Sequence, residues 1–205
     1  MKVLELLGIN PTKGELVTLT GKTGHGRTSM LVKIACDLAN EGKSVLFISD
    51  ELAIHQIAEK CTPLLKIENP RFKAVRSDYP VEIITDYFAE EQDIDVVVLD
   101  GYFGNKTNFR VLAQKHDTLI INTIQMNKSG FVTGDTRPMM TSDCVISVTR
   151  INGSLTLLDK LKNFFLFWKP KKVAPNTQLA LIKNRHGKQT KTDINFDFQS
   201  LQIKK

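Results

Sequence analysis

The chain has 205 residues, 24% of them charged, and a formal net charge of +6. This length is enough for one α/β domain with a sizeable core, and the modest basic excess is compatible with nucleic-acid binding without demonstrating it. The three cysteines have no metal-type spacing, the N-terminus carries no signal peptide, and no apolar stretch reaches transmembrane length. These features predict reduced thiols in a cytoplasmic protein with no membrane-spanning segment.

Short β-rich apolar segments alternate with segments of helical periodicity along the chain. The predicted strands are residues 15–20, 44–49, 73–76, 95–100, 118–124, 144–149, 178–183 and 194–198, the last of them an edge strand. The predicted helices are residues 29–39, 51–60, 80–89 and 108–115, and residues 126–141 are predicted to form a polar loop. This alternation predicts an α/β fold in which helices flank both faces of a mainly parallel central sheet. Without an internal repeat or a linker, residues 1–205 are expected to form a single domain.

A glycine-rich segment lies between the first predicted strand and the first predicted helix. It matches the nucleotide-binding pattern G-x-x-x-x-G-K-S/T, except that arginine occupies the lysine position. The residues expected to contact the nucleotide are Gly21, Lys22, Thr23, Gly24, His25, Gly26, Arg27, Thr28 and Ser29. The glycines let backbone N–H groups curl around phosphate oxygens, and the helix N-terminus favours an anion. The segment therefore predicts ATP binding, with the Thr28 hydroxyl as a ligand for Mg²⁺.

Two acids follow predicted strands at the edge where ligands bind in open α/β sheets. Asp100 closes the strand 95–100 and is predicted to hold Mg²⁺ with Thr28; the alternative is an ordinary strand-end acid. Glu51 follows the strand 44–49 and is the candidate general base for an attacking water. Its alternative role is a charge at a helix N-terminus.

Polar residues after two later strands complete the candidate catalytic set. Gln125 ends the strand 118–124 and either senses the γ-phosphate or is an ordinary surface glutamine. Lys183 and Arg185 follow a strand late in the chain. They are either solvated turn charges or cations that reach a phosphate across a subunit boundary.

Five segments, taken in order, resemble a known family. The P-loop is followed by residues 44–53, similar to a strand ending in S-L-E-M, and by residues 124–128, similar to S-Q-L-N-R. Residues 136–150 resemble a K-R-P loop with its D-A-D-x-V strand, and residues 183–197 resemble a closing K-N-R-x-G with its final strand. The chain thereby resembles, over residues 12–203, the motor domain of hexameric replicative DNA helicases of the DnaB type, including phage versions, within the RecA-like P-loop ATPases.

The resemblance implies roles for particular residues. It makes Glu51 the catalytic base, and it makes Lys183 and Arg185 contacts to the γ-phosphate bound by the neighbouring subunit of a homo-oligomer. The loop after Gln125 is expected to carry single-stranded DNA through Lys128 and Arg137, whose charges suit phosphate contacts. The alternative for that loop is a solvent-exposed segment without a nucleic-acid role.

Three departures from the family pattern bear on function. Arg27 replaces a compact ammonium with a bulky planar fork, which is expected to weaken hydrolysis more than binding. Few residues precede the first strand, so an N-terminal helicase domain is not expected and a closed hexamer is in doubt. Residues 151–177 are an apolar and basic segment, which packs on its own domain, docks a partner or another subunit, or binds a membrane surface.

Two main functions remain open. The first is an ATP-driven helicase or translocase that acts on single-stranded DNA as a ring or filament. The second is a weakly active or inactive ATP-binding accessory protein of replication or recombination, such as a loader or mediator. A viral genome-packaging ATPase is a third alternative.

Overall fold

The computed structural model describes residues 2–65, 71–90, 93–101, 107–127, 137–151 and 175–204. The strands are β1 (Leu16–Lys22), β2 (Val45–Ser49), β3 (Phe72–Arg76), β4 (Val96–Asp100), β5 (Leu119–Met126), β6 (Cys144–Arg150), β7 (Thr177–Asn184), β8 (Thr190–Asp197) and β9 (Gln202–Lys204). The helices are α1 (Val3–Leu6), α2 (Arg27–Asn40), α3 (Ile54–Cys61), α4 (Pro80–Ala89), α5 (Phe109–Lys115) and α6 (Arg137–Thr141).

The strands form one sheet in the order β3-β2-β4-β5-β1-β6-β7-β8-β9. The strands from β3 to β6 in this order pair in parallel, and β7, β8 and β9 then pair antiparallel. β1 therefore lies inside the sheet between β5 and β6, with the loops after β1, β2, β4 and β5 at one shared edge. This is the mainly parallel α/β architecture that the sequence predicts.

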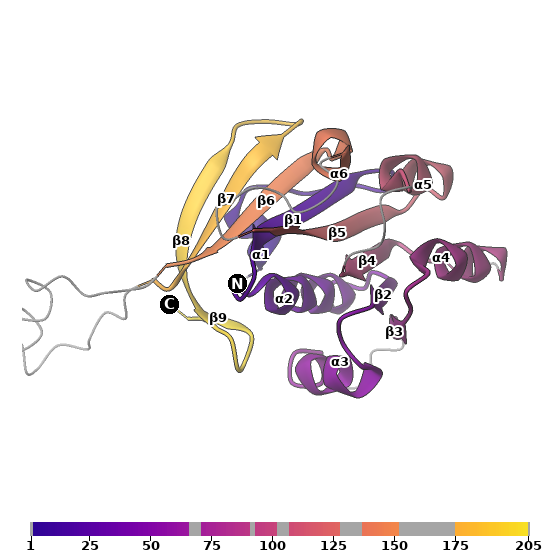
Figure 1. Ribbon diagram of the computed structural model, residues 1–205, viewed down its shortest axis with the longest axis horizontal. Coiled ribbons are helices and arrows are strands. Elements are labelled where there is room, and N and C mark those ends of the chain that lie inside the picture. The colour runs from indigo at the N-terminus through magenta and orange to yellow at the C-terminus, as the bar shows by residue number, and fades with distance from the viewer. Residues whose placement is uncertain are drawn as a thin grey trace, which may run out of the picture.

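Helices cover both faces of the sheet (Figure 1). On one face, buried residues of α1, α2 and α3 pack against β1, β2 and β6 to β8, and Met30, Ile34 and Phe47 are among the largest buried side chains there. On the other face, Ile84 of α4 and Phe109 of α5 pack on the opposite side of the parallel strands. The central strands are apolar on both sides because both sides are covered, which fixes the strand ends where the polar candidate residues lie.

Two sequence expectations are wrong in detail. Residues 126–141 are predicted to be loop, but α6 forms at their end, where Lys183 Nζ donates to the carbonyl oxygens of Met139 at 3.2 Å and Met140 at 2.6 Å. This tertiary cap comes from β7 and has no local signal. The segment 194–198 is not an edge strand, because β8 begins at Thr190 and is paired by β7 on one side and by β9 on the other.

The segment 151–177 is described only at its ends. β6 and β7 pair antiparallel, and the N–H of Ile151 donates to the carbonyl oxygen of Asn176 at 2.7 Å. Residues 152–174, which make up most of this apolar and basic segment, lie outside the described residues. Within the part of the chain that the structure describes, no helix is both long and apolar enough to cross a membrane.

Candidate nucleotide-binding and catalytic site

The glycine-rich segment forms a loop between β1 and the N-terminus of α2. Gly24 and Gly26 have φ of +78° and +87°, left-handed values that side chains rarely adopt. Gly26 is the N-cap of α2 and leaves the first N–H groups of this 14-residue helix without a side-chain cap. Such a helix end is an anion site, so strand, loop and helix together provide the phosphate cradle that the sequence predicts.

The Thr28 hydroxyl and the Asp100 carboxylate meet beneath this loop. Thr28 Oγ1 donates to Asp100 Oδ1 at 3.0 Å, and Ser49 Oγ donates to Asp100 Oδ2 at 3.2 Å. Asp100 is only 1% exposed. Burial, together with the negative charge of Glu51, raises the pKa of Asp100 to about 6, and the hydrogen bonds from Thr28 and Ser49 oppose this rise.

This pair of oxygen donors fits Mg²⁺. The ion prefers hard oxygen ligands and is usually held by one or two protein groups together with waters and substrate phosphates. A hydroxyl and a carboxylate 3.0 Å apart, at the base of a phosphate cradle, supply such a set. When bound, the ion would neutralise phosphate charge.

Glu51 follows β2 next to this pair. β2 and β4 are parallel neighbours with Ser49 opposite Asp100, so the residues after the two strands lie side by side. Gly101 permits the close approach of β2: a Cβ at this residue, whose φ is +129°, would lie 1.5 Å from Asp50 Oδ1. Glu51 is exposed, two residues after Ser49.

Arg27 lies within the electrostatic reach of both acids. Burial lowers the pKa of its guanidinium, and the negative charges of Glu51 and Asp100 oppose that shift. Its side chain also lies along β1, because a Cβ on Gly21 would be 3.3 Å from Arg27 Cγ. The arginine therefore lies between β1 and the two acids.

Gln125 contacts the P-loop directly. β5 pairs in parallel with β1, which places Gln125 opposite Gly21. Its Nε2 donates to Thr23 Oγ1 at 2.6 Å. This hydrogen bond ties the end of β5 to the P-loop.

Lys183 and Arg185 lie at the other end of the sheet. β7 runs antiparallel to β6, and Asn184 pairs with Cys144, where β6 begins. β1 has seven residues, so about 20 Å separates this end from the P-loop of the same chain. The structure does not bring these two cations to their own nucleotide site.

A buried carboxylate holds Arg185 at that end. Asp143, whose side chain is 2% exposed, forms ion pairs through Oδ1 with Arg110 at 2.6 Å and with Arg185 at 2.8 Å. Its Oδ2 accepts a hydrogen bond from the N–H of Leu16 at 3.0 Å. Burial and the positive charge of Arg185 lower the pKa of Lys183, which caps α6.

The two expected nucleic-acid residues differ in what the structure describes. Arg137 is exposed and begins α6. Lys128 lies outside the described residues. The connection between them starts at the P-loop end of β5 and finishes at the opposite end of the sheet, because β5 and β6 are both parallel to β1.

The sequence analysis assigned no role to four residues that contact the candidate site residues. Ser49 and Asp143 bond to proposed site residues through strand pairings that connect distant segments. Arg150 and Phe198 lie against the P-loop: the N–H of Arg150 donates to His25 Nδ1 at 3.1 Å, and a Cβ on Gly26 would lie 2.1 Å from Phe198 Cε1. Ser49, Asp143 and Arg150 lie in segments that match the family motifs, whereas Phe198 lies just outside them.

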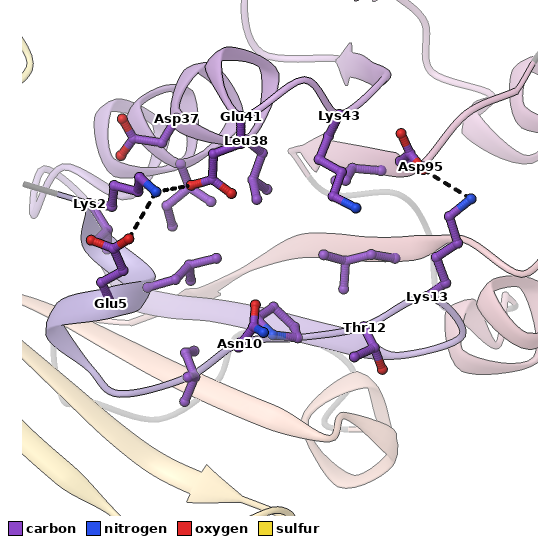
Figure 2. Close-up of a pocket in the computed structure, with 17 residues that line it drawn as sticks. Lys2, Glu5, Asn10, Thr12, Lys13, Asp37, Leu38, Glu41, Lys43 and Asp95 are labelled. Atoms are coloured by element: carbon purple, nitrogen blue, oxygen red, sulfur yellow. Dashed lines mark ion pairs between the residues drawn. The ribbon is translucent and has the colours of Figure 1, made fainter.

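A cavity lies away from these residues, at the other end of the strands. It has a volume of about 670 Å³ and is lined by the segment before β1, the C-terminal half of α2 and the beginnings of β4 and β5 (Figure 2). Ion pairs from Lys2 to Glu41 at 2.8 Å and from Lys13 to Asp95 at 3.0 Å lie along its rim. Because these elements are at the opposite end of the strands from the P-loop, the cavity is separate from the nucleotide site.

Comparison with solved structures identifies the fold. The ATPase domain of one DnaB-like helicase matches with a TM-score of 0.71 and 10% identity, over 98% of this chain and 87% of that one. A second DnaB-like replicative helicase, solved in a study of its interactions with primase, matches with a TM-score of 0.67 and 11% identity, over 95% of this chain and 59% of that one. The chain thus has the fold of DnaB-type, RecA-like ATPase domains, as the motif resemblance predicts.

Sequence comparison gives shorter matches. The DNA repair protein RadA of Campylobacter jejuni is 42% identical over 52 residues, which are 25% of this chain and 12% of that protein. RadA of Helicobacter pylori is 33% identical over 76 residues, 37% of this chain and 17% of that protein. No family model matches the chain. The chain therefore matches only a small part of the length of these curated relatives.

Proposed function

We propose that the chain is an ATP-binding and ATP-hydrolysing DNA motor, a helicase or translocase that acts on single-stranded DNA as a homo-oligomer. The observation that carries this proposal is the Thr28–Asp100 contact under the P-loop, with Glu51 beside it. These groups can hold Mg²⁺, bind the triphosphate and activate a water. The fold shared with DnaB-like helicase ATPase domains and the matches to two DNA repair proteins support DNA as the polymer.

The test is binding and turnover of ATP on a sample of known mass. Calorimetry should show ATP binding that depends on Mg²⁺, and steady-state turnover should rise when single-stranded DNA is added. Double-stranded DNA of equal nucleotide concentration is the control polymer. Absence of Mg²⁺-dependent binding of either ATP or ADP would remove the nucleotide assignment, and turnover indifferent to DNA would remove the motor assignment.

The second candidate is a weakly active ATP-binding accessory protein of replication or recombination. Arg27 favours it, because the guanidinium fork cannot occupy the place of an ammonium between β- and γ-oxygens. A viral genome-packaging ATPase remains a third possibility on the same architecture. The Arg27 side chain lies beside both acids of the site, so its replacement separates the candidates.

Arg27→Lys should raise ATP turnover, by about tenfold, if the arginine is a degenerate form of the lysine; a gain of this size corresponds to about 1.4 kcal/mol of transition-state stabilisation. Steady-state turnover measures this, and Arg27→Ala is the control that removes the charge altogether. A large loss in Arg27→Lys would mean that the site has been rebuilt around arginine. Arg27 would then contribute to ATP hydrolysis.

The connection after Gln125 should contact DNA through Lys128 and Arg137. Replacing both by alanine should weaken binding of single-stranded DNA similarly for all sequences and flatten its salt dependence, because phosphate contacts carry no sequence information. Fluorescence anisotropy at several salt concentrations measures both effects. The matched control replaces Arg76 and Lys115, two exposed cations elsewhere, and so removes the same charge. Unchanged affinity and slope would exclude this connection as the DNA contact.

A further inference from the structure

The cavity of about 670 Å³ at the opposite end of the strands from the P-loop has no part in the nucleotide site (Figure 2). One wall is the C-terminal half of α2 with the turn that follows it, and the other is the segment of residues 9–13 before β1. The volume lies within the range of small-molecule pockets, which hold a ligand against apolar walls and orient it with a few polar groups. The side chains that line the cavity therefore indicate the chemistry of its ligand.

The floor of the cavity is apolar. Its side chains come from α1, α2 and the beginnings of β4 and β5, and they include Leu4, Ile34, Leu38, Val96 and Leu119. Each of these residues is at most 9% exposed, so the floor is tightly packed before any ligand arrives. An apolar ligand body that covers this floor releases water from it, which favours binding.

Ion pairs lie at both ends of the cavity, and the pairs at the α1 end leave no free cation there. Lys2 is shared by two acids, Glu5 and Glu41, each at 2.8 Å (Figure 2). Asp37, which also lines this end, is paired with Lys33. This end therefore offers an anion no cation that is not already paired.

The other end holds two lysines and one largely buried acid. The Asp95 side chain is 19% exposed, pairs with Lys13 at 3.0 Å and accepts a hydrogen bond from the N–H of Ser44 at 2.9 Å. Burial would raise the pKa of this acid, but the bond from Ser44 and the charges of Lys13 and Lys43 lower it below its ordinary value. A second acid, Asp93, lies 3.8 Å from Lys13 but is 91% exposed, where water weakens the pair. Both oxygens of Asp95 are thus occupied, and within the described part of the chain the Lys43 ammonium has no hydrogen bond or ion pair.

Lys43 and Asn10 present polar groups to the cavity from opposite walls. Lys43 reaches in from the turn after α2, and Asn10 reaches in from the segment before β1 (Figure 2). Among the residues that the structure describes, the Asn10 side chain has no hydrogen-bond partner. An ammonium and an amide NH₂ are both donors, and a carboxylate is an acceptor with two oxygens. Charge-assisted hydrogen bonds of this kind are the strong ones.

We propose that this cavity binds a small apolar carboxylic acid, whose carboxylate pairs with Lys43 and Asn10 and whose aliphatic body lies on the apolar floor toward α1. The ion pairs bound the cavity at both ends, which favours a free acid over the last residue of a longer peptide chain. This binding goes beyond the proposed ATPase function and requires no nucleotide.

NMR titration of the ¹⁵N-labelled full chain without nucleotide tests this, with octanoate, octanol and octylammonium as probes of one length and three charges. Octanoate should shift the signals of residues around the cavity, including the side-chain amide of Asn10. It should bind about tenfold more tightly than octanol, because hydrogen bonds to charged groups contribute about this factor. Octylammonium should bind more weakly than either, since Lys43 repels it.

Lys43→Met keeps the aliphatic stem of the lysine and removes its charge. It should lower octanoate affinity by about tenfold and leave octanol affinity unchanged. The matched control is Lys115→Met, which removes an exposed cation on α5 and should change neither affinity. Asn10→Trp places a large ring in the cavity from an exposed position and should abolish binding of both probes.

Four outcomes overturn the proposal. Equal losses of octanoate and octanol affinity in Lys43→Met would exclude the pairing of charges, and binding that survives Asn10→Trp would place the ligand elsewhere. Tighter binding of acetyl-leucyl-leucine than of octanoate would replace the free acid by the C-terminus of a peptide. If the unaltered chain binds neither octanoate nor octanol, the site is removed, while the nucleotide assignment is untouched.

Discussion

Glu51→Gln should reduce ATP turnover by about 100-fold or more while changing ATP affinity little, since a general base acts on the water in the transition state and contributes typically this much. Glu51 follows β2 beside the Asp100–Thr28 pair and is exposed, so the substitution removes one charge without burying a polar group. Single-turnover hydrolysis and calorimetry with Mg²⁺ measure the two quantities separately.

The control for Glu51→Gln is Glu59→Gln. This substitution neutralises an exposed glutamate on α3, the helix that follows Glu51. Its turnover should equal that of the unaltered chain. Unchanged turnover in Glu51→Gln would exclude Glu51 as the base. Equal losses of affinity and turnover would instead indicate that the carboxylate acts in nucleotide binding, for example by positioning Arg27.

Arg185→Ala should lower turnover by about 1,000-fold yet leave P-loop binding largely intact, because a cation supplied in trans stabilises charge that develops only in the transition state. Activity per chain should also rise with protein concentration until assembly is complete. Mixing Arg185→Ala with Glu51→Gln should restore some activity, because one kind of mixed interface holds both an intact Glu51 and an intact Arg185.

A structural role for Arg185 has to be separated from this one, since Arg185 also pairs with Asp143. Asp143 retains Arg110 at 2.6 Å, so Arg185→Ala does not leave the buried carboxylate unpaired. Thermal unfolding measures any loss of stability, and Lys188→Ala removes an exposed charge from the same turn as a control. Concentration-independent turnover and an inactive mixture would refute the cross-subunit role and favour an accessory protein.

The sequence predicted the parallel core well because its central strands are rich in β-branched and other apolar residues. Val96–Asp100 and the first six residues of β5 are buried on both faces, so their composition marks them. The P-loop and the acid at the end of β4 could be paired from motif spacing. The contact between Thr28 and Asp100 then follows from the parallel order β4-β5-β1, which brings the ends of β4 and β1 to the same edge of the sheet.

What the sequence could not predict depends on contacts between distant segments. α6 forms with its carbonyls capped by Lys183 from β7, 44 residues after Met139. β8 loses its edge position because the short β9 folds back on it. Phe198 reaches Gly26 across most of the chain. None of these partners lies within a local window, so periodicity and propensity carry no information about them.

The P-loop and Arg185 lie at opposite ends of the sheet, so the proposed contact across subunits would limit which assemblies could be active. A twofold-symmetric dimer uses the same patch on both chains, whereas a contact between opposite ends is heterologous and repeats in one direction. If Arg185 completes a neighbour's nucleotide site as proposed, an open array joined in this way leaves its terminal nucleotide site without a partner's arginine. Closure into a ring would then complete every site, so activity per chain would report whether the array closes.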